Sequence, residues 1–232
     1  MIKLDYSPAL DLPLTLERFW RQVWFEVYPT KDMLLSVGPA YDTIKSKYKD
    51  PRRHYHNWSH PQKMLRMLTI MLPELKQTYG NLLKETDSQT MEVAPELIWA
   101  IGYHDVEYDV ESQKNEENSA NLMQIHLGRA CTDLATQLVL VTKTHKPVGM
   151  SIYECIMCDL DLHFLGVPWK EYKENTKAIA DEYCRIYTPE IWEMGRKNFC
   201  KEFSKRDRIF YTSPFFDRFE KQARENLQRG AE

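Results

Sequence analysis

The stretch Trp99-Ala-Ile-Gly-Tyr-His-Asp-Val-Glu-Tyr-Asp109 decides the predicted fold, because an apolar run ends abruptly in polar side chains. The apolar part is typical of a buried helix. An imidazole and a carboxylate side by side at its end, His104 and Asp105, are costly to remove from water without a partner. A divalent metal is one such partner, since histidine nitrogens and carboxylate oxygens are common metal ligands. The alternative is a solvated helix end with incidental charges, so the choice depends on partners elsewhere in the chain.

Length and composition restrict the class of protein. The 232 residues fit one large domain or two small ones, and 43% hydrophobic with 28% charged residues is ordinary for a soluble globular protein. The formal net charge of −3 argues against a protein that coats nucleic acid, but it allows a small phosphorylated substrate. The five cysteines form no disulfide scaffold, and neither a signal-like N-terminus nor a membrane-length apolar run is found. We therefore expect a cytoplasmic protein without a membrane segment.

Apolar residues recur at helical spacing along the whole chain, and no strand-like alternation is sustained. A polar, aperiodic segment at 80–93 is expected to be a surface loop. The pattern predicts one all-α domain over residues 1–232. Its expected helices cover about 11–27, 39–49, 61–75, 96–103, 116–128, 133–145, 152–162, 169–187, 189–203 and 214–229.

Several candidate metal ligands lie at or near the ends of these helices. Asp161 is the most informative of the later ones, because the run 158–165 places it and Asp159 among residues that favour burial. Buried carboxylates are normally paired or metal-bound, and an interior salt bridge is the competing interpretation for Asp161. The candidates are His60, His104, Asp105, Glu116, His145 and Asp161.

These residues resemble a known family. Their order matches the H…HD…D pattern of the HD superfamily of metal-dependent phosphohydrolases, an all-helical fold. The run Tyr55-His-Asn-Trp-Ser-His60 resembles the YHNxxH signature of cyclic-nucleotide phosphodiesterases and of a bacterial group of predicted HD phosphohydrolases. The segments 104–109, 115–120 and 159–166 resemble that group's HDxxYD, NExxSA and DADLxxLG motifs. The resemblance covers most of the chain and implies a metal-binding core at about 50–166, with C-terminal helices at about 168–230 packed on it.

The resemblance also implies a set of metal ligands. His60, His104, Asp105 and Asp161 would bind a first divalent ion, which could be manganese, iron, zinc, cobalt, nickel or magnesium. Related binuclear enzymes have histidines at the positions of Glu116 and His145. Glu116 therefore departs from the family pattern, although a carboxylate can also ligate a second metal.

The expected function is hydrolysis of a phosphoester or phosphoanhydride in a small, nucleotide-like substrate by metal-activated water. His56 matches the phosphodiesterase histidine that protonates the leaving oxygen, and Asp109 or Glu116 are the alternative proton carriers. The glutamine-bearing purine pocket of the phosphodiesterases is not recognisable, so specificity for cyclic nucleotides is not expected. The competing functions are an HD-type di-iron oxygenase and a non-catalytic nucleotide sensor.

Basic residues flank the motifs and could neutralise phosphate oxygens, although a solvated surface position is the alternative for each one. They are Arg52, Arg53, Lys143 and Lys146. Two further features are interpreted as structural. Cys155 and Cys158 form a CxxC within an apolar helical stretch, and we expect both thiols to be buried. The short cluster 205–208 is expected to be a solvated face between helices.

Overall fold

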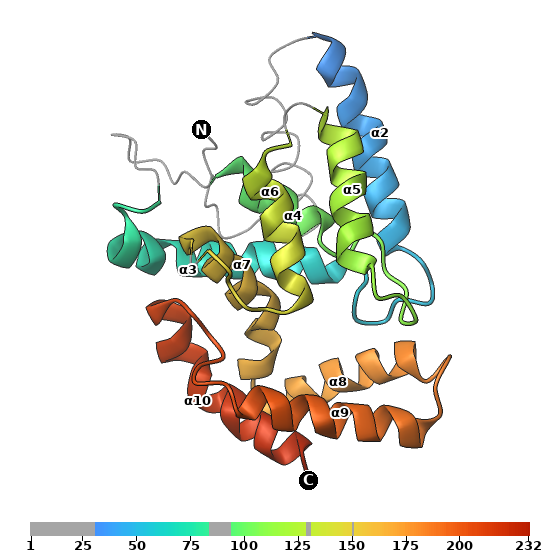
Figure 1. The fold of residues 1–232 in the computed structure, drawn as a ribbon, viewed down its shortest axis with the longest axis vertical. Helices are drawn as coiled ribbons and strands as arrows, with labels where there is room; N and C mark the ends of the chain where they lie inside the picture. The colour runs from blue at the N-terminus through green and yellow to red at the C-terminus, as the bar shows by residue number, and fades with distance from the viewer. Residues whose placement is uncertain (1–30, 84–93, 129–130, 150) are drawn as a thin grey trace.

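The computed structural model describes residues 31–83, 94–128, 131–149 and 151–232. The helix expected at 11–27 and most of the loop expected at 80–93 lie outside these ranges. Every regular element within them is a helix, which confirms the all-α prediction (Figure 1). In chain order they are α2 (Lys31–Tyr48), α3 (Ser59–Tyr79), α4 (Pro95–Tyr103), α5 (Asn115–Leu127), α6 (Asp133–Leu140), η2 (Val141–Lys143), α7 (Ile152–Leu162), η3 (His163–Gly166), α8 (Trp169–Tyr183), α9 (Pro189–Ser204) and α10 (Ser213–Gly230).

The short helix α4 lies in the middle of the core and packs against α3, α5, α6 and α7. All of its residues from Leu97 to Tyr103 are buried, which requires apolar side chains on every face. Pro95 occupies its first turn, where the missing N–H costs no helical hydrogen bond. Burying each large apolar side chain stabilises the fold by roughly 1.5–3 kcal/mol. The helix thus fixes the position of His104, which follows its last residue.

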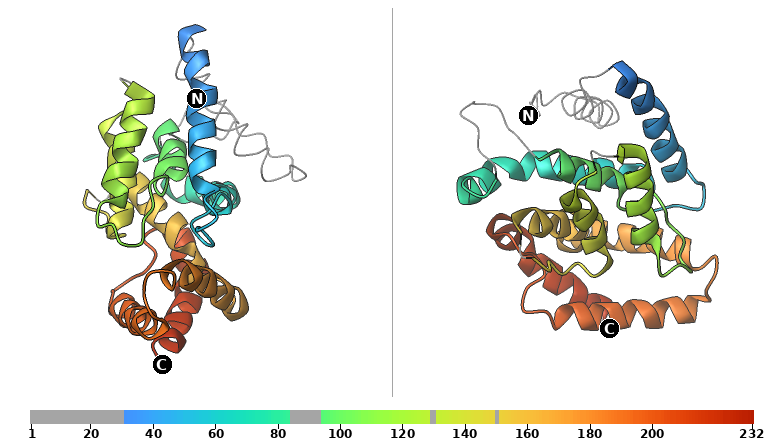
Figure 2. Two further views of the ribbon diagram at one scale, coloured as in Figure 1. Left: turned by 90° about the vertical axis from the view of Figure 1, so that its right-hand side faces the viewer. Right: turned by 45° about the horizontal axis from the view of Figure 1, so that its top comes forward.

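The helices α8, α9 and α10 form a second layer, which lies below the first in Figure 1 and in the left view of Figure 2. The two layers meet where α10 packs against η3. A Cβ at Gly166 would lie 2.6 Å from the Cβ of Phe219, so only glycine permits this approach. The buried amide of Asn226 donates to the carbonyls of Leu165 and Val167, both at 2.8 Å. A Gly166→Ala change would push the layers apart.

Several helix boundaries differ from the sequence-based expectation, among them the end of α8, which lies at Tyr183 rather than at residue 187. α2 begins at Lys31 rather than at residue 39, and Pro39 lies inside it. A proline removes one helical hydrogen bond without preventing the turns on either side, so it marked the start wrongly. α6 ends at Leu140 and tightens into η2, so His145 lies beyond the helix instead of at its end. The predicted end of α5 at Gly128 is confirmed, because the helix stops at Leu127. The φ of Gly128 is 55°, a value that glycine adopts without strain.

None of the helices in the described ranges has the combination of length and apolar character that crossing a membrane requires.

Candidate metal centre

Four side chains from three parts of the fold converge on one point. His60 comes from the first turn of α3, His104 and Asp105 directly follow α4, and Asp161 lies in the last turn of α7. The two imidazole Nε2 atoms are 3.1 Å apart. Asp161 Oδ1 lies 3.1 Å from His60 Nε2 and 3.7 Å from His104 Nε2. Asp105 Oδ2 lies 3.0 Å from His104 Nε2 and 3.6 Å from His60 Nε2.

These separations fit the ligands of a single ion. Two atoms bonded to one ion at about 2.1 Å lie about 3.0 Å apart at a right angle and about 3.4 Å apart at the tetrahedral angle. His60, His104 and Asp105 form a buried group that could hold a metal ion. Neutral imidazole nitrogens and carboxylate oxygens suit divalent transition metals in particular.

The charges of the cluster also favour a cation. The side chains of Asp105 and Asp161 are only 16% and 13% exposed, and among the described residues they contact histidine nitrogens but no lysine or arginine. Burial lowers the pKa of His104, but the two carboxylates outweigh it and raise this pKa to about 9. Burial lowers the pKa of His60 overall, although Asp161 acts in the opposite direction. The carboxylates therefore draw positive charge to the point at which the four ligand atoms meet.

The ring of His104 is oriented by the main chain. Its Nδ1 lies 3.1 Å from the carbonyl of Ile101, which accepts a hydrogen bond only if Nδ1 carries a proton. In the neutral ring this arrangement leaves the lone pair on Nε2, the atom that faces the cluster. Fixing the tautomer through the outer nitrogen is a common feature of histidine ligands.

His145 joins the cluster through the other oxygen of Asp161. Its Nε2 lies 2.8 Å from Asp161 Oδ2, so Asp161 connects His145 to the four-residue group. Glu116 is in the first turn of α5, and it makes no hydrogen bond or ion pair with the cluster among the residues that the structure describes. Burial and the charge of Asp105 raise the pKa of the Glu116 carboxyl group. Of the two second-metal candidates, His145 contacts the cluster and Glu116 acts on it only through its charge.

Glu182 of α8 organises the loop that carries His56. Its Oε1 accepts the backbone N–H groups of His54, Tyr55 and His56 at 2.7, 2.7 and 2.9 Å. Its Oε2 lies 2.6 Å from His56 Nδ1 and accepts the hydroxyl of Tyr108 at 3.0 Å. The ring of Tyr108 stacks on the His56 ring, with centroids 4.2 Å apart. One buried carboxylate thus fixes both the backbone and the imidazole of His56.

This pairing changes the pKa of both groups. Burial lowers the pKa of His56, but the hydrogen bond and charge of Glu182 raise it above its ordinary value overall. Burial raises the pKa of Glu182, but the hydrogen bonds from His56 and the backbone lower it overall. The sequence analysis missed Glu182. Its spacing from Tyr172, Asn175 and Ile179, which share the buried face of α8, is the signal that could have revealed it.

The other predicted residues lie around the cluster without joining it. Arg53 donates to the main-chain carbonyls of Asp105 and Val106 at 2.7 and 2.9 Å, so it holds the backbone of the His-Asp pair. The other four are exposed, and three of them have local partners. Arg52 pairs with Asp50 at 2.6 Å, and Lys143 pairs with Glu117 at 2.5 Å. Asp109 accepts the N–H of Glu111 at 3.0 Å. Lys146 makes no hydrogen bond or ion pair within the described ranges.

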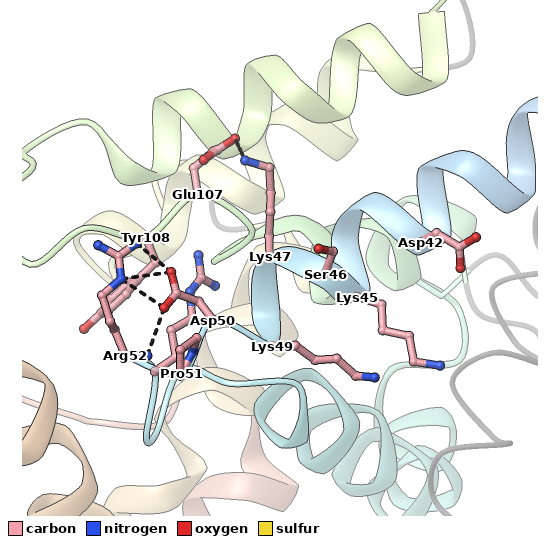
Figure 3. Close-up of a pocket in the computed structure, with 11 residues that line it drawn as sticks. Asp42, Lys45, Ser46, Lys47, Lys49, Asp50, Pro51, Arg52, Glu107 and Tyr108 are labelled. Carbon is pink, nitrogen blue, oxygen red and sulfur yellow. Dashed lines mark hydrogen bonds and ion pairs between the residues drawn. The ribbon is translucent and has the colours of Figure 1, made fainter.

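An open pocket of about 770 Å³ lies between the end of α2 and the loops at 49–53 and 107–108 (Figure 3). Arg52 and Arg53 are part of its wall, but none of the four converging ligands is. In Figure 3, Lys47 pairs with Glu107 and Arg52 pairs with Asp50. These ion pairs between wall residues neutralise part of the positive charge of the pocket. The pocket is therefore distinct from the group of candidate metal ligands.

Both cysteines of the CxxC are buried in α7, as expected, and burial raises the pKa of Cys155 to about 11. Comparisons of the chain with protein-family models, with curated proteins and with solved structures gave no match. The candidate site therefore depends on its own geometry.

Proposed function

We propose that this protein is a metal-dependent phosphohydrolase that cleaves a phosphoester or phosphoanhydride in a small, nucleotide-like substrate. One observation carries the proposal: His60, His104 and Asp105 form a group that could hold one metal ion, and Asp161 Oδ1 lies 3.1 Å from His60 Nε2. The resemblance of the motifs to the HD superfamily supports the choice of phosphoryl chemistry.

The four converging side chains would hold a divalent ion, and His145 with the outer oxygen of Asp161 offers ligands to a second. When bound, such an ion polarises a phosphoryl oxygen and lowers the pKa of water toward neutrality. The protein keeps the ligands in place beforehand. The Ile101 carbonyl fixes the His104 ring, and Arg53 fixes the backbone of Asp105.

His56 is the proposed general acid, the residue that donates a proton to the leaving oxygen. Its ring centroid lies 5.8 Å from that of the ligand His60, so it borders the cluster. Glu182 holds Nδ1, which leaves the Nε2–H for the substrate. Because Glu182 raises the pKa of His56, the ring stays protonated to a higher pH than an ordinary histidine does. Tyr108 stacks on the ring and fixes its plane.

A hydrolysis screen tests the proposal. The full chain is incubated with nucleotides and phosphoesters in the presence of Mn²⁺ or Co²⁺, beside Asp105→Ala, His104→Ala and the control Glu111→Gln. Glu111 is an exposed carboxylate in the same loop. We expect turnover of at least one substrate, lost in the first two variants and kept in the control. Turnover that persists in both ligand variants would overturn the proposal. Oxygen-dependent turnover with iron would indicate an oxygenase instead, and nucleotide binding without turnover would indicate a sensor.

A further inference from the structure

The segment 205–212, which connects α9 to α10, holds His145 by its backbone. The backbone of His145 has φ = 49°, and it is the one non-glycine residue with positive φ in the described ranges. A positive φ is uncommon for non-glycine residues, although histidine adopts it more often than most, and the contacts around His145 stabilise it. Arg206 Nη1 and the Tyr211 hydroxyl both donate to the His145 carbonyl at 2.9 Å, and Arg206 Nη2 donates to the Thr144 carbonyl at 2.9 Å.

The Arg206 side chain is committed to this role. Its guanidinium lies over the ring of Phe203, 3.7 Å from the centroid, and it makes no ion pair with a carboxylate among the described residues. Two N–H donors of one guanidinium, bound to two successive carbonyl groups, restrict the backbone of the residue between those carbonyls. The sequence alone placed Arg206 in a solvated cluster, whereas the structure gives it contacts with the loop of a candidate ligand.

The same segment is also attached to the helix that carries Asp161. Asp159, two residues before Asp161 in α7, accepts the N–H of Tyr211 at 2.7 Å and the N–H and hydroxyl of Thr212 at 2.8 and 2.7 Å. Tyr211 therefore contacts α7 through its backbone and His145 through its hydroxyl. This double attachment fixes the separation between the His145 loop and α7.

The segment itself is held by α10. Arg224 donates to the carbonyls of Arg206 and Asp207 at 3.0 and 2.9 Å and pairs with Glu220 at 2.7 Å. These contacts leave the backbone around Arg206 little freedom to follow a moving loop. The C-terminal layer thus serves as a rigid support for one side of the metal cluster.

We propose that Arg206 and Tyr211 are positioning residues that hold His145 against Asp161 at the metal centre. The inference rests on the proposed function, because it assigns the two residues a role in a metal site. Without Arg206, the backbone of His145 would relax from its left-handed conformation and His145 Nε2 would leave Asp161 Oδ2. His145 would then contribute less to metal binding, although every ligand is still present.

Calorimetric titration of the full chain with Mn²⁺ tests this inference. His145→Ala and Arg206→Ala should each weaken binding at the site that uses His145 by roughly tenfold or more, the usual effect of losing a residue that orients a ligand. The double variant should be no weaker than His145→Ala alone, because both changes remove the same contribution. Tyr211→Phe, which removes one of the two donors, should give a smaller loss. The control Lys205→Ala, an exposed neighbour, should match the wild type.

The outcomes separate this inference from the proposed function. Losses that add in the double variant would show a general structural effect and overturn the positioning role. Wild-type affinity in Arg206→Ala, beside a loss in His145→Ala, would also overturn it and leave the proposed function intact. A wild-type chain that binds no Mn²⁺, Co²⁺ or Zn²⁺ would remove the proposed function itself. If Arg206→Ala fails to fold by circular dichroism, Arg206→Lys and Tyr211→Phe provide the same comparison.

Discussion

Buried carboxylates occur in two regions of this protein, and the two regions satisfy them in opposite ways. In the C-terminal layer they accept hydrogen bonds from backbone amides. Glu220 accepts the N–H groups of Ile209 and Phe210, both at 3.0 Å, and pairs with Arg224 at 2.7 Å. Glu182 accepts three successive amides of the His56 loop. The hydrogen-bond donors and positive charges that these two carboxylates need come from the chain itself.

In the group of candidate metal ligands, by contrast, the carboxylates of Asp105 and Asp161 make hydrogen bonds and ion pairs only with histidine nitrogens within the described ranges. Histidine is neutral unless protonated, so the chain leaves these negative charges without a permanent positive partner. The positive charge that balances them must therefore come from a proton on a histidine or from a bound cation. The first region uses carboxylates to hold the fold, whereas the second has the ligand atoms that could hold a cation.

The largest effect is expected from Asp161→Ala, which removes the carboxylate shared by His60 and His145. Hydrolysis should fall by roughly 10³-fold or more, since metal catalysis supplies several kcal/mol of the barrier reduction. The free energy of unfolding in the absence of metal should also fall, because His60 and His145 lose the carboxylate with which they pair. Enzyme kinetics and urea unfolding measure the two quantities, with the exposed Asp217→Ala as control. A large loss of stability without loss of hydrolysis would place Asp161 with the structural carboxylates.

His56→Gln should reduce hydrolysis by about 10²–10⁴-fold, the usual contribution of a general acid. The affinity for Mn²⁺ should stay unchanged, because His56 makes no contact with a cluster ligand other than ring packing. Kinetics beside calorimetric titration separate the two effects. Loss of Mn²⁺ binding in this variant would make His56 a ligand and contradict its assignment.

Glu220→Gln tests the structural carboxylates. Oε2 accepts both backbone N–H groups and Oε1 pairs with Arg224, so the NH₂ group of a glutamine must face either the two buried N–H donors or the Arg224 guanidinium. The free energy of unfolding should fall by about 1–3 kcal/mol, with Mn²⁺ affinity unchanged. Urea unfolding measures the loss, and Glu225→Gln, an exposed position on the same helix, is the matched control. A stability equal to that of the control would refute the role given to Glu220.

The smallest effect is a dependence of stability on pH, which arises from the His56–Glu182 pair. The pKa of Glu182 is lowered in the folded state, so its contribution is present above the ordinary value of 4.5 and is lost as pH falls through the folded pKa. The pKa of His56 is raised, so its contribution is present below the ordinary value of 6.5 and is lost as pH rises through the folded pKa.

Stability from this pair should therefore be greatest between about pH 4.5 and 6.5 and decline on both sides. Urea unfolding at a series of pH values measures the profile. In Glu182→Gln the decline above the ordinary pKa of His56 should shrink or disappear, because the carboxylate raises this pKa whereas burial lowers it. An unchanged profile in that variant would mean that the two groups are not coupled.

The sequence was sufficient for the helical fold and for the core of the site. The spacing of apolar residues predicted α4 and its burial. The histidine beside a carboxylate at its end left a metal site and a solvated helix end both open, and the resemblance to the HD superfamily added His60 and Asp161 to the expected ligands. The placement of His60 at the start of α3 was also predicted, and the structure confirms it. These features depend on residues within one or two helical turns, where spacing determines which face is buried.

Contacts between distant segments could not be predicted in this way. Glu182 lies 126 residues from His56 along the chain, and nothing in helical spacing says which loop covers a given face. Arg206 looked like part of a solvated cluster, because its charge suggests exposure unless its partners are known. Those partners are main-chain carbonyls, which are the same in every sequence and leave no trace in residue type.

The most direct test of the contrast between the two regions is elemental analysis of protein purified without chelator, with wild type beside Asp105→Ala. The account predicts about one or two equivalents of transition metal per chain in the wild type, lost in the variant, since a ligand of a nitrogen–oxygen site is removed. Metal-free protein in both samples, even after incubation with manganese, iron and zinc, would contradict it. Asp105 and Asp161 would then be buried carboxylates neutralised by histidine protons alone, and only the helical fold would stand.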